Sequence, residues 1–494
     1  MKDYLLGIDI GTSSCKAAVF DADGKTVASQ SRGYPVYYPQ PGYAEQKPGQ
    51  WWDSVCCVLR DIFGRGEVAP ADIRAVGVDG QSWSAIVVDK HGDVLFDNPI
   101  WMDTRASGVC AEVGGLIGEK AIFDLCGNTF SPAYTTPKLI WFKKNYPGVY
   151  KNAYKALQSN SYIVYKLTGQ YSQDLSQGYG LHFFDMRKGV WDADMAREMD
   201  VDLNLMPDIY PCHAAVGAVS AEAAAQTGLQ QGTPVVAGGL DAACGTLGVG
   251  VISEGQTQEQ SGQAGGMSVC LEGYKAHEKL IMSFHVAPDR WLLQGGSVGG
   301  GGTLKWLKEN IFTGLSFEDL SRLAAESPVG SNGIVYLPYM AGERSPIWDK
   351  KAKGVYYGLN YANNRNDITR ATMEGVAFSL LHNIETAGEA GAYVTSMNAS
   401  GGAADSEIWM RIKADVTGKD MRQARSDNAT ALGAAILAGV SAGVYSDFHD
   451  AVEKTAQINK VYSPNPENHE KYKKYYGIYL RLYDNLCSLM QSSD

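Results

Sequence analysis

The chain has 494 residues, with 43 Lys and Arg against 54 Asp and Glu, a formal net charge of −11. This length corresponds to roughly three domains, or two large ones, with a core that needs no disulfide support. The acidic balance argues against a nucleic-acid or anionic-membrane binder, because such proteins need a basic face. It still allows a small anionic ligand, since a few backbone N–H groups can bind phosphate in an acidic protein.

The cysteines and the hydropathy pattern exclude several further classes. Nine cysteines are scattered along the chain without any C-x-x-C spacing, so neither a zinc site nor a redox dithiol is expected. An odd number of thiols without a secretory leader predicts reduced cysteines and a cytoplasmic location. No run of about 18 apolar residues predicts a membrane span.

The first elements are expected to be strands joined by tight turns. Apolar runs at 4–10 and 16–20 flank the sequence DIGTSS, and the turn DADG at 21–24 leads into a third strand. Apolar residues at helical spacing predict a helix over 49–63. A further strand over 73–79 runs into the sequence GQSWS.

The same arrangement recurs in the second half of the chain. A strand at 234–241 ends in GGLD and meets a run of small residues, and strands at 255–269 and 397–403 also contain glycine pairs. A Tyr-rich closing helix is expected over 469–489. Strands that run into glycine-rich turns and then helices predict an α/β protein. We expect two similar halves that meet near 245–255 and pack around a cleft.

Glycine-rich turns are the first indication of chemistry. They lie at 11–14, 262–266, 295–302 and 401–402. Backbone N–H groups in such turns can reach a phosphate that no side chain blocks. A single turn of this kind is more often only a turn, but four of them favour a phosphate ligand. Neither the P-loop motif nor a dinucleotide fingerprint is present.

Two aspartates end apolar strands beside these turns. A carboxylate there costs desolvation energy unless it holds a metal, a proton or a donor, the alternative being a helix cap. Asp9 precedes a hydroxyl-rich turn, which suits water-mediated Mg²⁺ with phosphate. Phosphoryl transfer to a hydroxyl needs a carboxylate that accepts the proton, and Asp241 suits this role.

Taken together, these motifs resemble the FGGY carbohydrate kinases over essentially the whole chain. GIDIGTS at 7–13 is similar to the first phosphate motif of the family, GGLD at 238–241 to its catalytic-aspartate motif, and 354–374 to its second signature. Residues 134–141 are similar to the first signature. GERSP at 342–346 is similar to a xylulokinase-like segment and is expected at a domain contact.

The resemblance implies two actin/Hsp70/hexokinase-like (ribonuclease H-like) ATPase domains around a cleft. An N-terminal domain over 1–247 would bind sugar, and a C-terminal domain over 248–494 would bind nucleotide, with the terminal helix able to pack back on the first. The implied site residues are Asp241 as the catalytic base; Gln81, Ser82, Trp83, Trp101, Asp103 and Asp241 for sugar; Gly11, Thr12, Ser13, Lys16, Gly262, Gln263, Gly401, Gly402 and Ala403 for ATP; and Asp9 for the metal.

The chain departs from the family pattern at two places in the site. Gln263 replaces the threonine of the second phosphate motif, so the expected hydroxyl is missing. Trp83 replaces the histidine of the xylulokinase G-Q-M-H-G motif, which removes one partner for a sugar hydroxyl. Asp103 and Arg105 lie two residues apart, and if they pair, no cation is left there for a substrate carboxylate.

The resemblance therefore implies ATP-dependent phosphorylation of a sugar hydroxyl with Mg-ATP, a ketopentose such as D-xylulose being the favoured substrate. Glycerol, erythritol, gluconate or a deoxy-hexulose are the alternative substrates, and a non-catalytic ATP-binding relative is the alternative of a different class. The expected partner is a small-molecule sugar or polyol, with no nucleic acid and no membrane, and a homodimer is left open.

Overall fold

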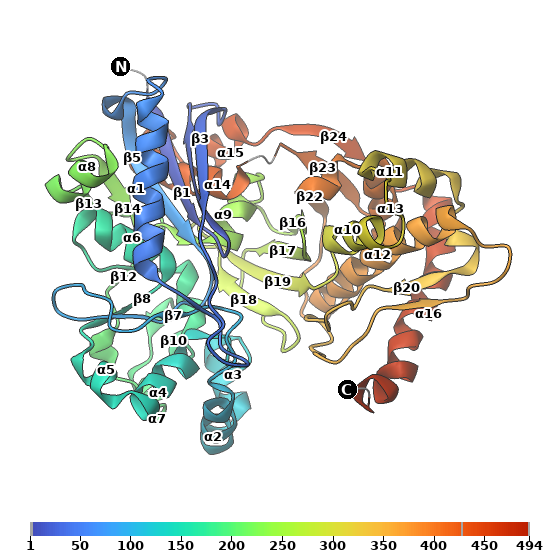
Figure 1. Cartoon of the computed structure of the whole chain (residues 1–494), viewed down its shortest axis with the longest axis horizontal. Helices are drawn as coiled ribbons and strands as arrows, with labels where there is room; N and C mark the ends of the chain where they lie inside the picture. Colours follow the sequence, from blue (N-terminus) through green and yellow to red (C-terminus); the bar gives the residue numbers. More distant parts are fainter. Residues whose placement is uncertain (1–2, 426–427, 493–494) are drawn as a thin grey trace.

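The computed structural model describes residues 3–425 and 428–492, which form two halves that lie side by side, each built on a seven-stranded sheet (Figure 1). The strands of the first sheet come from the chain before residue 241, and those of the second sheet from the chain after residue 255. The predicted α/β architecture with two similar halves is therefore confirmed.

The first sheet carries the predicted N-terminal strands. β1 (Tyr4–Ile10) pairs antiparallel with β2 (Ser14–Phe20), which pairs with β3 (Thr26–Gly33). On the other side, β1 is parallel to β5 (Ile73–Gly80), and β5 pairs with β14 (Pro234–Val236) and β15 (Gly239–Leu240). The interior strands β1 and β5 are mostly buried and apolar, apart from Arg74 and the aspartates near their ends, because helices cover both faces. α1 (Pro48–Gly64), at the predicted place, packs on β2 and β3.

The second sheet repeats this order of hairpin and parallel strands. Its strands, in spatial order, are β18 (Ile281–Phe284), β19 (Trp291–Ser297), β17 (Gly265–Leu271), β16 (Gln256–Ser261), β22 (Ser396–Ser400), β23 (Asp420–Ala424) and β24 (Ile458–Tyr462). The segment 255–269 is thus a hairpin with its turn at 262–264. The helices around this sheet are α10 (Gly301–Asn310), α11 (Phe317–Glu326), α12 (Arg365–Glu389), α13 (Glu407–Thr417) and α16 (Pro466–Ser492).

Small residues bring the two halves into close contact. α9 (Asp241–Gly248) packs on α14 (Ala429–Ser441), and α14 also covers β1 and β5 of the first sheet. A Cβ on Gly7 or Gly77 would lie 1.8 or 1.9 Å from a carbonyl oxygen of α14, so the helix can approach only because these strand residues are glycines. The chain after residue 248 therefore returns to the first sheet, and the two halves share this helix.

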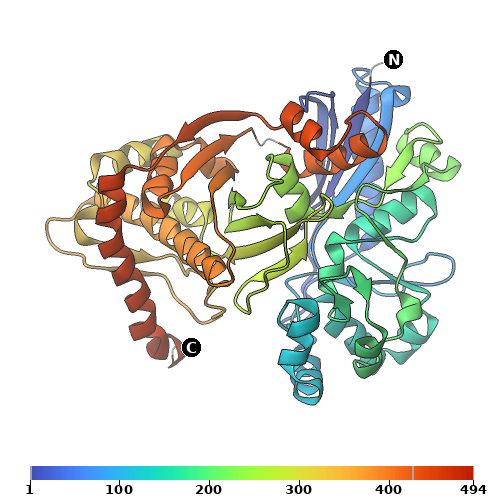
Figure 2. The same cartoon turned by 180° about the vertical axis from the view of Figure 1, so that it is seen from behind.

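The terminal helix does not return to the first domain as the sequence had allowed. α16 packs along α12, α13 and β20 (Val335–Leu337) of the C-terminal half, and Figure 2 shows it on the side away from the N-terminal half. Its tyrosines hold it there: Tyr472 donates to Glu374 at 2.7 Å, and the hydroxyls of Tyr479 and Tyr339 are 2.6 Å apart. The expected Tyr-rich helix is present, and its apolar face packs into the hydrophobic core of the C-terminal half.

The remaining helices lie mainly in the N-terminal half. They are α2 (Ser107–Ile117), α3 (Glu119–Cys126), α4 (Thr135–Asn145), α5 (Pro147–Asn152), α6 (Ser159–Thr168), α7 (Ala193–Glu198) and α8 (Ala221–Thr227), with α15 (Phe448–Thr455) beside α14. Within 3–425 and 428–492, no helix is both long and apolar enough to cross a bilayer. All nine cysteines are free thiols.

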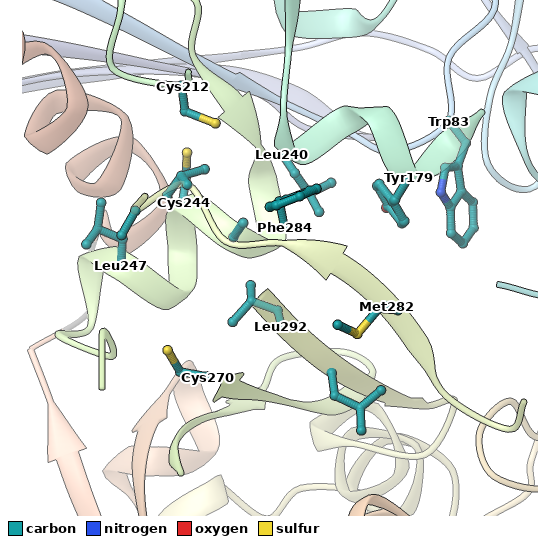
Figure 3. Close-up of a cluster of buried hydrophobic side chains, with 14 of the residues drawn as sticks. Trp83, Tyr179, Cys212, Leu240, Cys244, Leu247, Cys270, Met282, Phe284 and Leu292 are labelled. Atoms are coloured by element: carbon teal, nitrogen blue, oxygen red, sulfur yellow. The ribbon is translucent and has the colours of Figure 1, made fainter. Parts of the chain in front are cut away.

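One hydrophobic core runs through both halves (Figure 3). Leu240 and Leu247 of the N-terminal half contribute to the same buried cluster as Met282, Phe284 and Leu292 of the C-terminal half. Trp83 lies at one end of the side chains drawn in Figure 3, beyond Tyr179. The core therefore reaches the segment in which the sugar-binding residues are predicted.

Candidate active site

A cavity of about 510 Å³ opens between the two halves and collects most of the residues predicted to bind nucleotide. From the N-terminal half it is lined by Asp9, Gly11, Lys16 and Asp241, and from the C-terminal half by Gly262, Gln263 and Gly401. Residues far apart in the sequence thus meet at one place. Thr12 and Ser13 are not part of this lining.

Two hairpin turns face the cavity from opposite halves. The first joins β1 to β2 and is closed by the Gly11 N–H, which donates to Ser14 O at 3.1 Å. The second joins β16 to β17, beside β22, which is parallel to β16 and ends at Ser400. Gly401 follows with φ +91°, and a Cβ there would lie 2.8 Å from Ser261 O. Only glycine therefore fits where the two turns of the C-terminal half meet.

Asp9 shares the end of its strand with an acid that the sequence analysis did not single out. Asp79 is the register partner of Asp9 on β5, and Lys16 is its partner on β2. Asp79 is 0% exposed, and no N–H or O–H donor among the described residues reaches its oxygens. Burial and the Asp9 charge raise the pKa of Asp79 well above its ordinary value, so it stays protonated and donates to Asp9.

Asp79 and Lys16 favour the ionised form of Asp9 and so oppose the effect of its burial. Burial raises its pKa to about 6, against the opposing effects of the Asp79 hydrogen bond and the Lys16 charge. The sequence shows only that Asp79 lies near the end of an apolar strand, and it does not show that Asp9 is its neighbour. The parallel register of β1 and β5 is what places the two acids together.

Asp241 stands at the first turn of α9, where it lines the cavity opposite the phosphate turns. Its Oδ1 accepts from the Ala242 N–H at 2.7 Å. Burial, followed by the Asp9 charge, raises the pKa of Asp241 to about 7. A carboxyl group with this pKa can hold or release a proton near neutral pH, which suits a general base.

A second cavity of about 280 Å³ adjoins the first. Gly262 and Gln263 line both cavities, while Gly402 and Ala403 line the second one with Phe317 and Trp409. The Gln263 side chain lies against the start of α10, since a Cβ on Gly302 would be 2.1 Å from its Nε2. The first cavity is therefore lined mainly by polar and small residues, and the second also has the aromatic side chains of Phe317 and Trp409.

The predicted sugar-binding residues lie on the N-terminal side of the cleft. Trp101 Nε1 donates to Thr12 Oγ1 at 2.9 Å, and Thr12 Oγ1 is 3.5 Å from Gln81 Oε1. Thr12 thus ties the turn between β1 and β2 to two of the residues predicted to bind sugar. Gln81 is fully buried, and its Nε2 donates to Gln46 at 2.8 Å, so it supports the turn as well.

Trp83 has an unusual conformation and environment. Its backbone φ is +60°, and its ring stacks on Tyr134 with centroids 4.0 Å apart. The residue is only 8% exposed, and its Nε1 has no hydrogen-bond partner among the described residues. Next to it, Tyr179 donates to Ser82 Oγ at 2.7 Å. The surroundings of Trp83 are therefore aromatic, and its indole N–H is buried without a partner among the described residues.

Comparisons with known proteins decide the family. The chain matches the FGGY family of carbohydrate kinases, with its N-terminal domain over residues 4–248 and its C-terminal domain over 275–442. The chain belongs to this family. It is an enzyme, a carbohydrate kinase, and the family resemblance of its motifs is confirmed.

Relatives match the kinase over nearly its whole length. The xylulose kinase of Bacillus subtilis (strain 168) is 30% identical over 489 residues, which cover 98% of each chain. The xylulose kinase structure from Rhodospirillum rubrum has a TM-score of 0.90 and 28% identity, covering 99% of this chain and 100% of that one. The gluconate kinase structure from Lactobacillus acidophilus has a TM-score of 0.92 and 25% identity, covering 98% of both. The predicted two-domain ATPase fold is confirmed.

One predicted sugar-binding residue of the kinase serves another purpose. Asp103 is 0% exposed, and its Oδ2 accepts from the Ala44 N–H at 2.7 Å and from Arg105 Nη2 at 2.8 Å. Arg105 also donates to Glu45 at 2.7 Å. These contacts occupy the Asp103 carboxylate, so it fixes the loop behind Trp101 instead of facing the cleft. The sequence left open whether Asp103 and Arg105 pair with each other. The structure shows that they do.

A buried lysine beneath the sugar pocket was also missed as a site residue. Lys138 Nζ donates to the carbonyl oxygens of Trp83 and Ile100, at 2.8 Å each. Burial lowers its pKa to about 7. Lys138 therefore holds both walls of the pocket by their backbones. The sequence did give one indication of Lys138, because it is a charged residue within the segment that resembles the family's first signature. This segment forms part of α4 and is buried.

Proposed function

We propose that the protein phosphorylates a ketopentose, D-xylulose, with Mg-ATP as the donor and Asp241 as the general base. The observation that carries this proposal is the position of Asp241. Its carboxyl group lines the same 510 Å³ cavity as both phosphate turns, and its pKa is raised to about 7. A base at this place can reach a hydroxyl held between the pocket wall and the terminal phosphate.

The proposed reaction is an in-line transfer. The sugar hydroxyl oxygen attacks the terminal phosphorus, its proton passes to the Asp241 carboxylate, and ADP leaves with the electron pair of the broken P–O bond. Lys16 and the backbone N–H groups of the two turns face the phosphates, where they would stabilise the charge. The adjoining chamber with Gly402 and Ala403 would hold the adenosine, and Gln263 would lie between base and phosphates.

The residues present fit a magnesium ion bound together with ATP. Among the described residues no group of three or more His, Cys, Asp or Glu side chains could hold a metal. Mg²⁺ usually takes one or two carboxylates together with substrate phosphates and water. Asp9 lines the cavity and is poised near its ionised form, so it would hold the ion, which supplies positive charge against the phosphates.

The substrate is inferred from the relatives and the pocket wall. The curated relative from Bacillus subtilis is named a xylulose kinase, as is the one from Staphylococcus epidermidis (strain ATCC 12228 / FDA PCI 1200), 29% identical over 98% of this chain and 97% of its own. The predicted sugar segment carries the Trp83 N–H, which has no partner among the described residues, and the Ser82 hydroxyl, and both would suit sugar hydroxyls. A cytoplasmic location and a homodimer stay predictions.

A coupled ADP-release screen over ketopentoses, polyols and aldonates tests the proposal. We expect the highest kcat/KM with D-xylulose. Gluconate is the second candidate, because a gluconate kinase structure matches the chain with a TM-score of 0.92. Gluconate as the best substrate would overturn the ketopentose assignment, and ATP turnover that no sugar stimulates would overturn the kinase proposal.

A further inference from the structure

The guanidinium of an arginine in the C-terminal half lies close to the predicted sugar-binding segment of the N-terminal half. Arg344 belongs to the GERSP segment, and its guanidinium carbon lies 6.0 Å from the centre of the Trp101 ring. Trp101 in turn is fixed by its hydrogen bond to Thr12. A guanidinium of one half therefore faces the sugar-side wall of the other half.

Hydrogen bonds fix the residues on both sides of Arg344, so its side chain extends from an anchored piece of backbone. Glu343 Oε1 accepts from the Val298 N–H at 2.7 Å, and Ser345 Oγ accepts from the Gly296 N–H at 2.6 Å. The residue between these anchors is Arg344. A Cβ on Gly296 would lie 2.7 Å from Arg344 Nη2, so the glycine of β19 leaves room for the guanidinium.

The guanidinium is largely desolvated without an acceptor of its own. No oxygen within residues 3–425 and 428–492 forms a hydrogen bond or ion pair with the Arg344 side chain. Burial lowers the pKa of Arg344, and the neighbouring Glu343 charge only partly compensates. A distance of 6.0 Å is at the limit of a cation–π contact, so the ring alone does not repay the desolvation. The guanidinium beside the Trp101 ring therefore keeps N–H donors without a protein acceptor, and oxygens of a ligand could accept from them.

We propose that Arg344 is a substrate-binding residue, contributed by the C-terminal half, that donates hydrogen bonds to oxygens of the sugar. The sugar is favoured over the phosphates because neither Arg344 nor Trp101 lines the nucleotide cavity, whereas Trp101 adjoins Gln81 through Thr12. This inference rests on the proposed function. Arg344 would supply a positive charge to the substrate, because Arg105 is already paired with Asp103 and Glu45.

Steady-state kinetics of Arg344→Gln and Arg344→Lys test the proposal, with D-xylulose and ATP varied separately. Loss of a charge-assisted hydrogen bond is expected to raise the KM for the sugar about 10- to 100-fold in the Gln variant. The KM for ATP and the ATP hydrolysis without sugar should stay within about twofold. The Lys variant keeps the charge but loses the planar fork, so its sugar KM should also rise.

Arg187→Gln is the matched control, because its guanidinium lies over the Tyr274 ring at 4.2 Å and outside the cleft. It should leave both KM values unchanged. An unchanged sugar KM in both Arg344 variants would overturn the proposal, as would a rise confined to the KM for ATP, which would assign the guanidinium to the phosphates. If the unmodified enzyme phosphorylates no sugar, the proposed function fails first and this inference with it.

Discussion

Lys413 and Glu259 form a buried ion pair directly behind the second phosphate turn. The ammonium of Lys413 lies 2.7 Å from Glu259 Oε1, and the two side chains are 1% and 4% exposed. The Ser261 hydroxyl contacts both groups. Gln258 and Gln260 line the cavity, whereas Glu259 lies on the other face of the strand and meets Lys413 of α13. Ser261 belongs to the cavity lining, and its hydroxyl also contacts Lys413. The pair therefore fixes the end of β16 where the turn begins.

Lys413→Met should impair nucleotide binding more than sugar binding. Removing one partner of a buried pair leaves an uncompensated charge and costs about 3–5 kcal/mol of stability. The same change frees Ser261, so the KM for ATP should rise about tenfold while the KM for sugar stays near its original value. Thermal unfolding and steady-state kinetics measure both effects.

The double variant Glu259→Leu with Lys413→Met separates stability from positioning. Replacing a buried pair by apolar side chains is often neutral or stabilising, so the melting temperature should recover. The KM for ATP should stay high, since Ser261 still lacks its partners. Arg411→Gln, which removes an exposed ion pair to Glu407 on the same helix, is the control and should change neither quantity. Recovery of both quantities in the double variant would show that the pair has only a structural role.

Asp79 should be replaceable by asparagine but not by leucine. The amide introduced by Asp79→Asn can donate to Asp9 as the protonated acid does, whereas Asp79→Leu leaves Asp9 buried without that donor. Asp79→Asn should therefore keep the Mg²⁺ dependence of the reaction. Asp79→Leu should raise the Mg²⁺ concentration for half-maximal activity about tenfold, because Asp9 then resists ionisation. Equal Mg²⁺ dependence of the two variants would contradict this account.

These residues show where prediction from the sequence succeeds and where it stops. The strands, the glycine turns and Asp9 and Asp241 are local patterns, so they could be placed from the sequence. Asp79 and Lys413 act through neighbours that strand register and helix packing bring to them, more than 60 residues away in the chain. The contacts of Asp103 could not be read from the sequence for the same reason, because Ala44 donates to it from 59 residues away and Glu45 shares its partner Arg105.

Asp241→Asn should lower kcat by about 10²- to 10⁴-fold and leave sugar affinity largely unchanged, because the amide cannot accept the proton. In the unmodified enzyme, kcat/KM should rise with pH and level off above about 7, where the base is ionised. Activity measured from pH 5 to 9 checks this. A flat profile, or an Asn variant with near-normal kcat, would contradict the assignment.

The same pKa sets a pH dependence of stability. The pKa of Asp241 rises from 3.8 to about 7 on folding, so its bound proton favours the folded state below 3.8, and this stability is lost as pH rises to 7. The ligand-free enzyme should melt at a lower temperature at pH 8 than at pH 5. Asp241→Asn, which cannot ionise, should lose a few degrees less over this range.

Trp83 should determine which sugar fits the pocket. Its ring is stacked on Tyr134, its carbonyl oxygen accepts from Lys138, and its Nε1 has no hydrogen-bond partner among the described residues. The bulk of this fixed ring narrows the pocket, and the single N–H offers a sugar hydroxyl one donor but no acceptor. A histidine is smaller and can both donate and accept. Trp83→His should therefore raise kcat/KM for D-xylulose relative to other ketoses, by about 10-fold for one added hydrogen bond.

Trp83→Phe provides the comparison for that change, because a phenyl ring can still stack on Tyr134 but lacks the N–H and is smaller than the indole. If the N–H binds the sugar, the Phe variant should lose affinity for every ketose that places a hydroxyl there, with the KM for ATP unchanged. Melting temperatures of both variants control for the left-handed backbone at this position, which φ +60° makes costly for any side chain. The same order of ketose preference in the original enzyme and in both variants would mean that Trp83 belongs to the core joining the two halves and does not select the sugar.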